Sequence, residues 1–295
     1  MIVSIGEVGV NLDFYPWIRL FDPNGGLVIT RNSGAATQFE VTANLTGTYT
    51  LRVGSNNSNT YFDGTGDYVL RRVKVPGTYV VSQGDQGGTM TNGDNHTGHI
   101  DLGDVDVWTF AANQNDAIAV SIGEIPVGPS DPDPGFYPWI RLYNPLGAPV
   151  QARNGGDVAQ IGTGILTAPI TGTYTVVVGT NNSNIYFDGT GDYILTLAKV
   201  PGTFVVPTGD HGGLLTNGAI HTGRIDLGDL DMWSFSANQG DAITVSIGEV
   251  LVSPTEPDPG FYPWIRLYDP LGALAGTRNG GNVAQVVATA GLTGT

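Results

Sequence analysis

The chain reads Phe-Tyr-Pro-Trp-Ile-Arg-Leu three times, at residues 14–20, 136–142 and 261–267. Within this stretch Tyr, Trp and Arg alternate with Pro, Ile and Leu, which is the period-2 pattern of a strand with one buried face. The last two copies lie 261 − 136 = 125 residues apart. This period is too long for a solenoid repeat and has the size of an independently folding domain. The sequence therefore predicts a string of similar modules.

Other repeated stretches keep the same order within each copy. Val-Ser-Ile-Gly-Glu begins at Val3, Val120 and Val245, and Asn-Asn-Ser-Asn begins at Asn56 and Asn181. The first interval is shorter, 120 − 3 = 117 residues, and the missing residues fall in two turns. Insertions confined to turns are what surface loops tolerate.

The second copy of the repeat contains several short segments that we expect to be β-strands. The segments 117–122, 139–143, 174–178 and 193–197 are rich in β-branched and aromatic residues and are bounded by Gly, Pro, Asn and Asp. We find no convincing segment with a helical period of about 3.6 residues. Short strands separated by such turns are typical of an antiparallel sandwich. We therefore expect an all-β chain of tandem antiparallel β-sandwich modules with a repeat of about 125 residues.

The repeat predicts five segments. They are a partial sandwich over 1–75, a connector over 76–97, a complete sandwich over 98–200, a second connector over 201–222 and a partial sandwich over 223–295. The first copy lacks the Asp-x-Asp-x-Trp-x-Phe strand that opens the other two, and the third lacks the last two strands of the second. We expect a window cut from a longer array, with strand exchange between chains as the alternative.

The connectors themselves repeat. Both contain Val-Pro-Gly-Thr, Gly-Asp, Gly-Gly, Thr-Asn-Gly and His-Thr-Gly in the same order. Free linkers rarely keep such detail, so we expect each connector to be ordered and to pack on a neighbouring module.

Composition excludes several classes of protein. With 12 Lys+Arg against 27 Asp+Glu the net charge is −15, which argues against binding to nucleic acid or to an anionic membrane. No apolar run reaches the roughly 18 to 20 residues of a membrane helix, so we expect no membrane insertion. The absence of Cys excludes disulfides, thiolate metal sites and a Cys nucleophile. Met1 leads into a strand-like stretch, so we expect any export signal to lie outside this chain.

Catalytic motifs are missing from the sequence. The four histidines are His96, His99, His211 and His221, and none lies in a His-Glu-x-x-His motif. The sequence also has no nucleophile elbow and no phosphate-binding loop. His96 and His221 occupy equivalent positions in His-Thr-Gly, which favours a structural hydrogen bond over a metal ligand or a base. We expect a protein that is not an enzyme.

Calcium is the one cofactor that the sequence suggests, because hard cations need several oxygen ligands at close spacing. Three kinds of loop offer them. The residues are Asp63 and Asp67 with their counterparts Asp188 and Asp192; Asp101, Asp104 and Asp106 with Asp226, Asp229 and Asp231; and Asp131 and Asp133 with Glu256 and Asp258. The alternative is that Asp and Asn in these Gly-rich turns cap their own backbones.

Aromatic side chains repeat in the Phe-Tyr-Pro-Trp stretch. They are Tyr15, Trp17, Tyr137, Trp139, Tyr262 and Trp264. Tyr and Trp are common on surfaces that bind sugar or peptide, so these residues are candidates for a ligand or interface platform. The alternation favours the other interpretation, in which one face of the strand packs into the core.

The order of motifs resembles the bacterial pre-peptidase C-terminal domain. The residues that carry the resemblance are Gly-Asp-Val-Asp-Val-Trp-Thr-Phe at 103–110, Ala-Asn-Gln-Asn-Asp-Ala at 112–117, Ile-Arg-Leu-Tyr-Asn-Pro-Leu-Gly at 140–147, Gly-Thr-Tyr-Thr-Val-Val-Val at 172–178 and Gly-Asp-Tyr-Ile-Leu at 191–195. That family consists of jelly-roll-like β-sandwich modules on secreted peptidases and in tandem on surface proteins. The resemblance implies export, a non-catalytic role and sometimes calcium. No peptidase domain precedes the modules in this chain.

Two functions follow as hypotheses. The first is an extracellular or cell-surface structural and adhesive protein, in which modules build a fibre, filament or stalk and the partners are other copies of the chain. The second is a binding module that anchors a secreted enzyme or an adhesin to collagen-like peptide or polysaccharide. An ordered interface between modules would favour the first, and exposed aromatics in a concave patch would favour the second.

Overall fold

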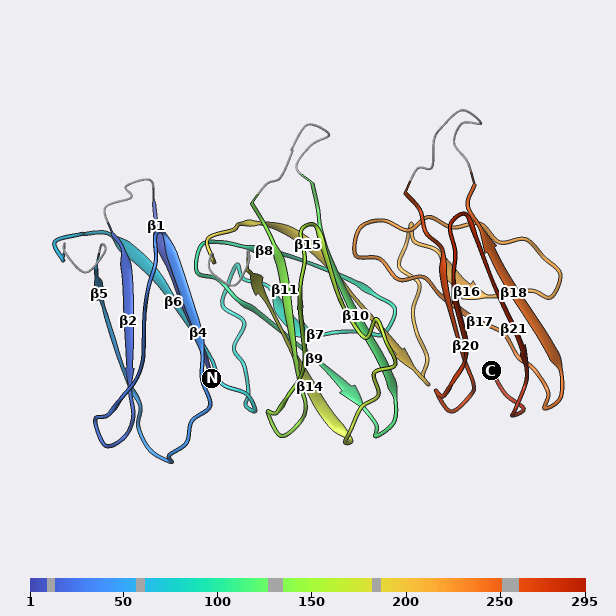
Figure 1. Ribbon diagram of the computed structural model, residues 1–295, viewed down its shortest axis with the longest axis horizontal. Coiled ribbons are helices and arrows are strands. Elements are labelled where there is room, and N and C mark those ends of the chain that lie inside the picture. Colours follow the sequence, from blue (N-terminus) through green and yellow to red (C-terminus); the bar gives the residue numbers. More distant parts are fainter. Residues whose placement is uncertain (10–13, 57–61, 127–134, 182–186, 251–259) are drawn as a thin grey trace.

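The strand patterns of the sequence produce three β-sandwiches that lie side by side in one row (Figure 1). A computed structural model describes residues 1–9, 14–56, 62–126, 135–181, 187–250 and 260–295. These residues form strands β1 to β21 and no helix, so none of them forms a helix that could cross a membrane. The all-β architecture expected from the sequence is confirmed.

The central sandwich has two sheets. The larger has the order β12-β11-β14-β9-β7, and the smaller has the order β13-β10-β15-β8. The strands of the larger sheet are β7 (Gly87–Thr89), β9 (Asp106–Ala112), β11 (Pro138–Tyr143), β12 (Pro149–Asn154) and β14 (Gly172–Thr180). Those of the smaller are β8 (Asn95–Ile100), β10 (Ala117–Glu124), β13 (Val158–Ile161) and β15 (Gly191–Val200). All pairs are antiparallel except β7 with β9.

The core of the central sandwich lies between these sheets. Residues along β9 alternate between buried and partly buried, so that Asp106, Trp108 and Phe110 face inward. Phe110 stacks on Tyr174 of β14 with ring centroids 5.6 Å apart. Burying one large apolar side chain stabilises the fold by about 1.5–3 kcal/mol, and this core contains twenty buried residues.

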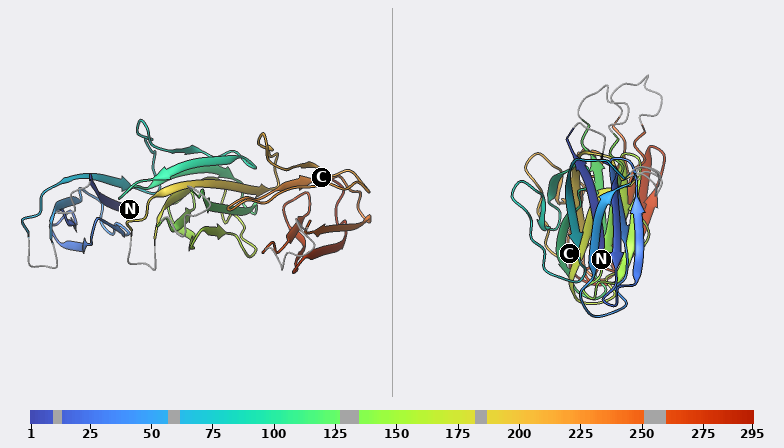
Figure 2. Two further views of the ribbon diagram at one scale, coloured as in Figure 1. Left: turned by 90° about the horizontal axis from the view of Figure 1, so that it is seen from above. Right: turned by 90° about the vertical axis from the view of Figure 1, so that its left-hand side faces the viewer.

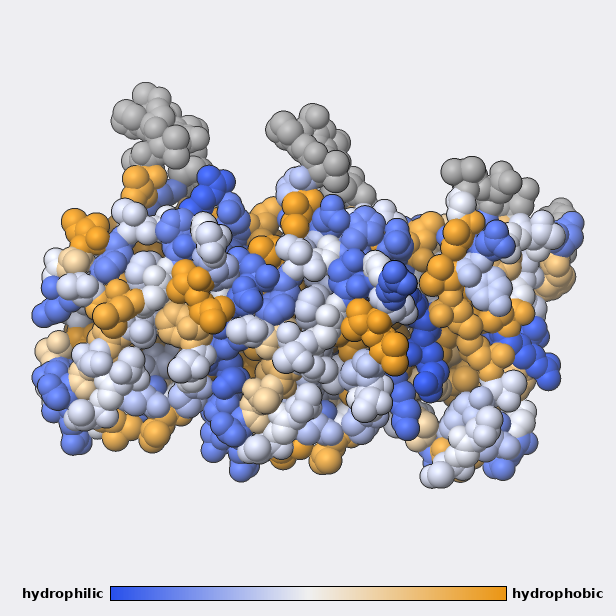
Figure 3. All heavy atoms as spheres, turned by 180° about the vertical axis from the view of Figure 1, so that it is seen from behind, coloured by the Kyte–Doolittle hydropathy of each residue, from blue (hydrophilic) through white to orange (hydrophobic). Residues whose placement is uncertain are grey.

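The first sandwich repeats part of this arrangement. Its sheets have the orders β4-β1-β6 and β3-β2-β5. The strands are β1 (Ile2–Val8), β2 (Pro16–Phe21), β3 (Leu27–Asn32), β4 (Ala36–Glu40), β5 (Thr50–Ser55) and β6 (Asp67–Val73). Val3, Ile5, Ile18, Leu20 and Phe39 form most of its core. Two large apolar side chains of this sandwich, Tyr68 and Leu70 of β6, are exposed. Seen from behind, the apolar surface of the molecule is most continuous over this sandwich (Figure 3).

The third sandwich contains three two-stranded sheets. They pair β16 with β17, β18 with β21, and β19 with β20. The strands are β16 (Gly212–Leu214), β17 (Met232–Ser234), β18 (Ala242–Gly248), β19 (Trp264–Tyr268), β20 (Leu274–Asn279) and β21 (Val283–Thr289). Ala284 and Val286 are its buried apolar residues, so the described part of this sandwich has a small core.

An apolar cluster fills the junction between the first two sandwiches. Ile2 and Val73 of the first sandwich are buried against Val105, Tyr143 and Val177 of the second. The first two modules are thus packed in contact, and the view from above shows all three modules in one row (Figure 2).

The glycine of Val-Ser-Ile-Gly-Glu is required by this packing. A Cβ atom on Gly6 would overlap the carbonyl of Leu102 in the next module, and one on Gly123 would overlap the carbonyl of Leu227. At both junctions the backbone of the later module therefore touches the Val-Ser-Ile-Gly-Glu strand of the module before it, which is β1 at the first junction and β10 at the second. Gly248 occupies the same place in the third copy, and a Cβ there would have only Val283 at 3.8 Å and a carbonyl at 4.0 Å.

The connectors add contacts at both junctions. Pro76 packs on Gly147, and Pro201 packs on Gly272. Each proline follows a cis peptide bond, Val75–Pro76 or Val200–Pro201. The module boundaries near these prolines stay predictions from the repeat.

Candidate metal centre

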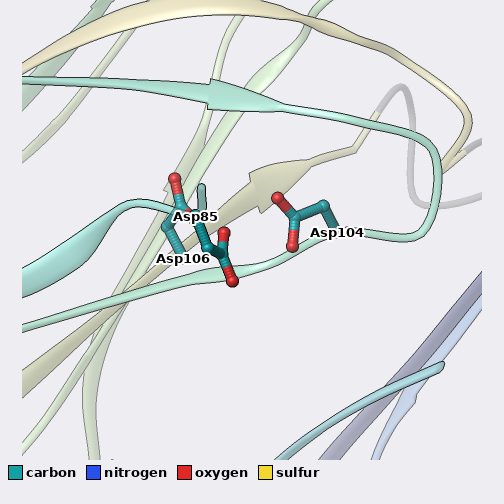
Figure 4. A group of neighbouring side chains, drawn as sticks. All are labelled: Asp85, Asp104 and Asp106. Atoms are coloured by element: carbon teal, nitrogen blue, oxygen red, sulfur yellow. The ribbon is translucent and has the colours of Figure 1, made fainter. Parts of the chain in front are cut away.

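Two groups of three aspartates stand out among the described residues. The groups are Asp85, Asp104 and Asp106 at the first junction, and Asp210, Asp229 and Asp231 at the second. In each group every residue offers one carboxylate oxygen, and these oxygens lie within 4.8 Å of one another. Figure 4 shows the first group, in which the carboxylates of Asp85 and Asp106 lie next to each other and that of Asp104 lies beside them.

Local chain geometry explains the first group. The parallel pairing of β7 with β9 places the turn before β7 beside the start of β9. Asp85 closes that turn with a hydrogen bond from its backbone N–H to the carbonyl of Ser82. Asp104 closes the turn before β9 in the same way onto Asp101, and Asp106 is the first residue of β9. The connector therefore supplies one carboxylate and the sandwich supplies two.

The second group is built from the same elements. Asp210 closes the turn before β16 onto Pro207, and Asp229 closes the turn before β17 onto Asp226. β16 pairs in parallel with β17, which begins directly after Asp231. The arrangement thus recurs 210 − 85 = 125 residues later.

Burial disfavours the charged form of these aspartates and raises their pKa values. Desolvation raises the pKa of Asp106 to about 8, an effect that the hydroxyl of Tyr193 opposes and that Asp104 and Asp85 increase. Desolvation also raises the pKa of Asp104 to about 6, although Arg71 opposes this change. At the second group desolvation, followed by the charges of Asp229 and Asp210, raises the pKa of Asp231 to about 7.

Asp106 provides a test of whether a cation fits. Its side chain is 1% exposed, and its Oδ2 accepts a hydrogen bond of 2.5 Å from the Tyr193 hydroxyl. Trp108 Nε1 donates to that same hydroxyl at 2.9 Å, which fixes its orientation. Asp106 Oδ1 is buried with no hydrogen-bond partner. A buried carboxylate oxygen without a donor, beside two further carboxylates, fits a hard divalent cation such as calcium.

A guanidinium group lies at the first group but not at the second. Arg71 of β6 forms ion pairs with Asp85, whose Oδ2 lies 2.5 Å from Nη1, and with Asp104, whose Oδ1 lies 3.0 Å from Nε. The equivalent residue at the second group is Thr196, which donates to Asn95 Oδ1 at 3.0 Å. Asn95 Nδ2 in turn donates to Asp210 at 2.9 Å. The two groups therefore differ in charge although their aspartates match.

Four of the expected ligands, Asp104, Asp106, Asp229 and Asp231, lie in these groups. The sequence also predicts Asp101 and Asp226 as ligands, but Asp101 pairs with His99 at 3.4 Å and Asp226 pairs with Arg224 at 2.8 Å.

The other predicted loops are placed differently. Asp63, Asp67 and Asp188 are exposed and belong to no acidic group of three within the described ranges. Asp192 is also exposed and binds His99 at 2.7 Å. Asp131 and Asp133, with Glu256 and Asp258, lie outside the described residues.

Sequence reasoning missed Asp85 and Asp210. Both lie in the connectors, where the repeated Gly-Asp indicates an ordered connector but does not by itself predict a ligand. The spacing of 125 residues that links these two aspartates was the available signal.

The repeated aromatic stretch contributes to the core and to the junctions. Phe14 is 6% exposed and Phe136 is fully buried, whereas the tryptophans are partly exposed on the opposite face of their strands. Each tryptophan stacks under the guanidinium two residues later: Arg19 on Trp17 at 3.7 Å, Arg141 on Trp139 at 3.8 Å and Arg266 on Trp264 at 3.8 Å. Of the tyrosines, Tyr15 and Tyr137 are partly exposed and Tyr262 is 62% exposed.

The arginines of these pairs reach the preceding module. Arg141 is 2% exposed and lies 3.7 Å from Glu40. With its amide oxygen facing the guanidinium, Gln38 accepts from both Nη atoms at 3.0 Å. Arg266 donates to the carbonyl of Gly162 at 2.6 Å. The Trp-x-Arg pair is thus part of the junction.

The histidines of His-Thr-Gly are structural, as expected. The backbone N–H of Thr91 donates to His96 Nε2 at 3.1 Å, and that of Thr216 donates to His221 Nε2 at 3.1 Å. The rings also pack edge-on against Trp108 and Trp233.

Comparison with known proteins gives partial matches of low identity. No family model and no curated protein matches the chain. Among solved structures, the pre-peptidase C-terminal domain of a collagenase from Bacillus anthracis matches with 17% identity and a TM-score of 0.29, over 38% of this chain and 95% of that domain. PliG from Aeromonas hydrophila, a periplasmic inhibitor of g-type lysozyme, matches with 16% identity and a TM-score of 0.27, over 39% of this chain and 98% of that protein. Each of these two matches spans less than two fifths of this chain.

Proposed function

We propose that this chain is a non-enzymatic, extracellular structural protein, in which β-sandwich modules dock head to tail to form part of a stalk or filament. One observation carries the proposal: the same module-to-module contact occurs twice. At both junctions the glycine of the Val-Ser-Ile-Gly-Glu strand touches the Leu-Gly turn of the next module, and a connector proline packs on the next module's turn glycine.

Head-to-tail contacts extend an array without closing it. Such an interface joins two different surfaces, so each added module leaves another surface free. The cluster around Ile2, Val105 and Val177, together with the buried Arg141, supports a junction that resists bending. An acidic surface with a net charge of −15 keeps such an array soluble.

Calcium belongs to the proposal as a stabiliser of the connectors. Asp85 lies in the first connector and Asp106 lies in the sandwich, and Asp210 and Asp231 are placed likewise at the second. A cation held by such a group would tie the connector to the sandwich and offset the repulsion among buried carboxylates.

A binding module remains a second candidate because of one groove. It has a volume of about 570 Å³ and lies between the connector and the large sheet of the central sandwich, lined by Tyr79, Val81, Thr89, Val107, Thr109 and Thr173 among others. An extended peptide or a sugar would fit such an open surface, which both apolar and polar side chains line.

Small-angle X-ray scattering of the chain tests the structural proposal. We expect a profile that matches one fixed row of three sandwiches in calcium, and a longer maximum dimension after treatment with EGTA. A profile of freely jointed beads in both conditions would overturn the proposal. Binding of a collagen-like peptide or a polysaccharide in the 570 Å³ groove would then favour the anchoring module.

A further inference from the structure

The two ends of the row are formed by sheet faces whose equivalents meet inside the chain. The sheet β3-β2-β5 forms one end, and the pair β18-β21 forms the other (Figure 1). At the first junction β11 and β14, the equivalents of β2 and β5, lie against β1 and β6 in the cluster of Ile2, Val73, Tyr143 and Val177. The equivalent of β1 in the third sandwich is β18. The two end faces therefore correspond to the two sides of a junction.

A side-chain contact marks each junction between such faces. With its amide oxygen facing the guanidinium, Gln38 of β4 accepts from both Nη atoms of Arg141 at 3.0 Å. At the second junction Arg266 donates to the carbonyl of Gly162 at 2.6 Å. Gly162 directly follows β13, the strand that carries Gln160, the equivalent of Gln38. In both cases the arginine of a Trp-x-Arg strand binds the Gln-bearing segment of the preceding module.

The face of β18 and β21 has the same pattern but is uncovered. Ser4 and Ser121 are 2% and 3% exposed because the next module covers them, whereas the equivalent Ser246 is exposed. Gln285 lies opposite Ser246 and donates to its hydroxyl at 2.8 Å, so its amide oxygen is the atom that can accept from a guanidinium. Val287 of the same strand is 71% exposed. This face therefore has the residues of a junction without the module that would cover them.

The face of β2 and β5 presents the other half of the contact. Arg19 stacks on Trp17 at 3.7 Å, as Arg141 stacks on Trp139 at 3.8 Å. Arg141 is 2% exposed against the preceding module, whereas Arg19 is partly exposed and forms no ion pair within the described residues. Stacking on the ring already orients the guanidinium of Arg19, so little conformational freedom is lost when it binds a partner.

We propose that the β3-β2-β5 face of one chain docks on the β18-β21 face of a second copy, with Arg19 bound to Gln285 as Arg141 is bound to Gln38. The inference rests on the proposed head-to-tail function and names the partner at the ends of the row. The argument is continuity, because equivalent faces already form the junctions within the chain. The contact joins two different surfaces, so each added copy leaves one of each kind free and association is open-ended.

The contact between copies is weaker than a junction within one chain. No connector spans it, and the first copy of the repeat lacks the Leu-Gly turn that touches Gly6 and Gly123 inside the row. A short connector also gives the internal junctions an effective concentration of about 1 mM, so we expect copies to associate as their own concentration approaches that value.

Sedimentation velocity of the full chain in calcium, up to about 1 mM, tests the contact. The sedimentation coefficient of the wild-type chain rises with concentration and reaches no plateau at a dimer. Arg19→Glu removes the donor and weakens association by about tenfold or more, because hydrogen bonds to a charged group are lost. Gln285→Arg sets two guanidinium groups against each other and has the same effect. An equimolar mixture of the two variants associates again, since each face then meets a complementary one.

Arg31→Glu is the matched control, because it changes the net charge by the same amount as Arg19→Glu. Arg31 lies on β3 opposite Ile18, which belongs to the core, so its side of the sheet is not the one that carries Arg19. This variant leaves association unchanged. Circular dichroism checks that every variant is folded.

Three results would each overturn the inference: a constant sedimentation coefficient up to about 1 mM, equal weakening by Arg31→Glu and Arg19→Glu, or a mixture that fails to associate. Association that Arg19→Glu leaves unchanged would place the contact elsewhere and would overturn it as well. The proposed function fails separately, through a flexible scattering profile of the dilute chain. A rigid row that stays monomeric overturns only the present inference.

Discussion

Gly123 is the residue on which the second junction depends most directly. It lies on β10 against the backbone of Leu227 and Gly228, where no side chain can move aside. We expect Gly123→Val to push the third sandwich away, at a cost of about 1–3 kcal/mol or more for overpacking. Scattering will show a longer particle, and proteolysis of the second connector will be faster.

The third copy supplies the control for that substitution. A Cβ on Gly248 would meet Val283 at 3.8 Å, which is an ordinary contact. Gly248→Val should therefore leave the particle dimensions unchanged. Equal effects of the two substitutions would show that the glycine matters for the strand and not for the junction.

Asp106 predicts how stability depends on pH when calcium is removed. Its pKa is about 8 in the folded chain and near 4 when unfolded, so the folded state holds the proton over this interval. The free energy of unfolding then falls as pH rises from about 4 to 8, by on the order of 1 kcal/mol per pH unit. Urea unfolding at several pH values in EGTA measures this slope.

Asp106→Asn isolates that contribution. Asparagine carries no charge at any of these pH values and still accepts from the Tyr193 hydroxyl through its amide oxygen. We expect the variant to become more stable relative to wild type as pH rises. A difference that stays constant from pH 5 to pH 8 would contradict the raised pKa.

At the scale of elements, β11 connects two modules through Arg141. Its guanidinium contacts Gln38 and Glu40 of the preceding sandwich, and Trp139 covers its face at 3.8 Å. Hydrogen bonds to a charged group contribute about 1.5–3 kcal/mol, so Arg141→Ala should destabilise the chain by about that amount. Arg19→Ala removes the equivalent guanidinium from a partly exposed site on β2 and should cost less. Thermal unfolding compares the two, and equal losses would mean that stacking on tryptophan is the main contribution.

The sequence predicted long strands well and short ones poorly. The expected segment 117–122 lies within β10, and 193–197 lies within β15, because branched and aromatic residues alternate there. β7 and β16 have three residues each and are mostly glycine, so neither carries a side-chain pattern. These two strands position the turns of Asp85 and Asp210, which is why the third ligand of each group was missed.

The candidate metal site was also only partly predictable from the sequence. The sequence predicts Asp104 and Asp106 as ligands because the Asp-x-Asp spacing is a local pattern. The ion pairs of Arg71 with Asp85 and Asp104 join residues from different modules, and no local pattern reports such a contact. Charge complementarity across a junction becomes apparent only once the modules are docked.

For the whole molecule, the row of sandwiches has a direction. Each junction joins a glycine-bearing strand of one module to a Leu-Gly turn and a Trp-Arg strand of the next, so the two surfaces are chemically unlike. A row built this way is polar, because its two ends present different surfaces. If one end is attached to a cell, the opposite kind of surface always faces outward, and only a partner that recognises that surface can join or cap the row.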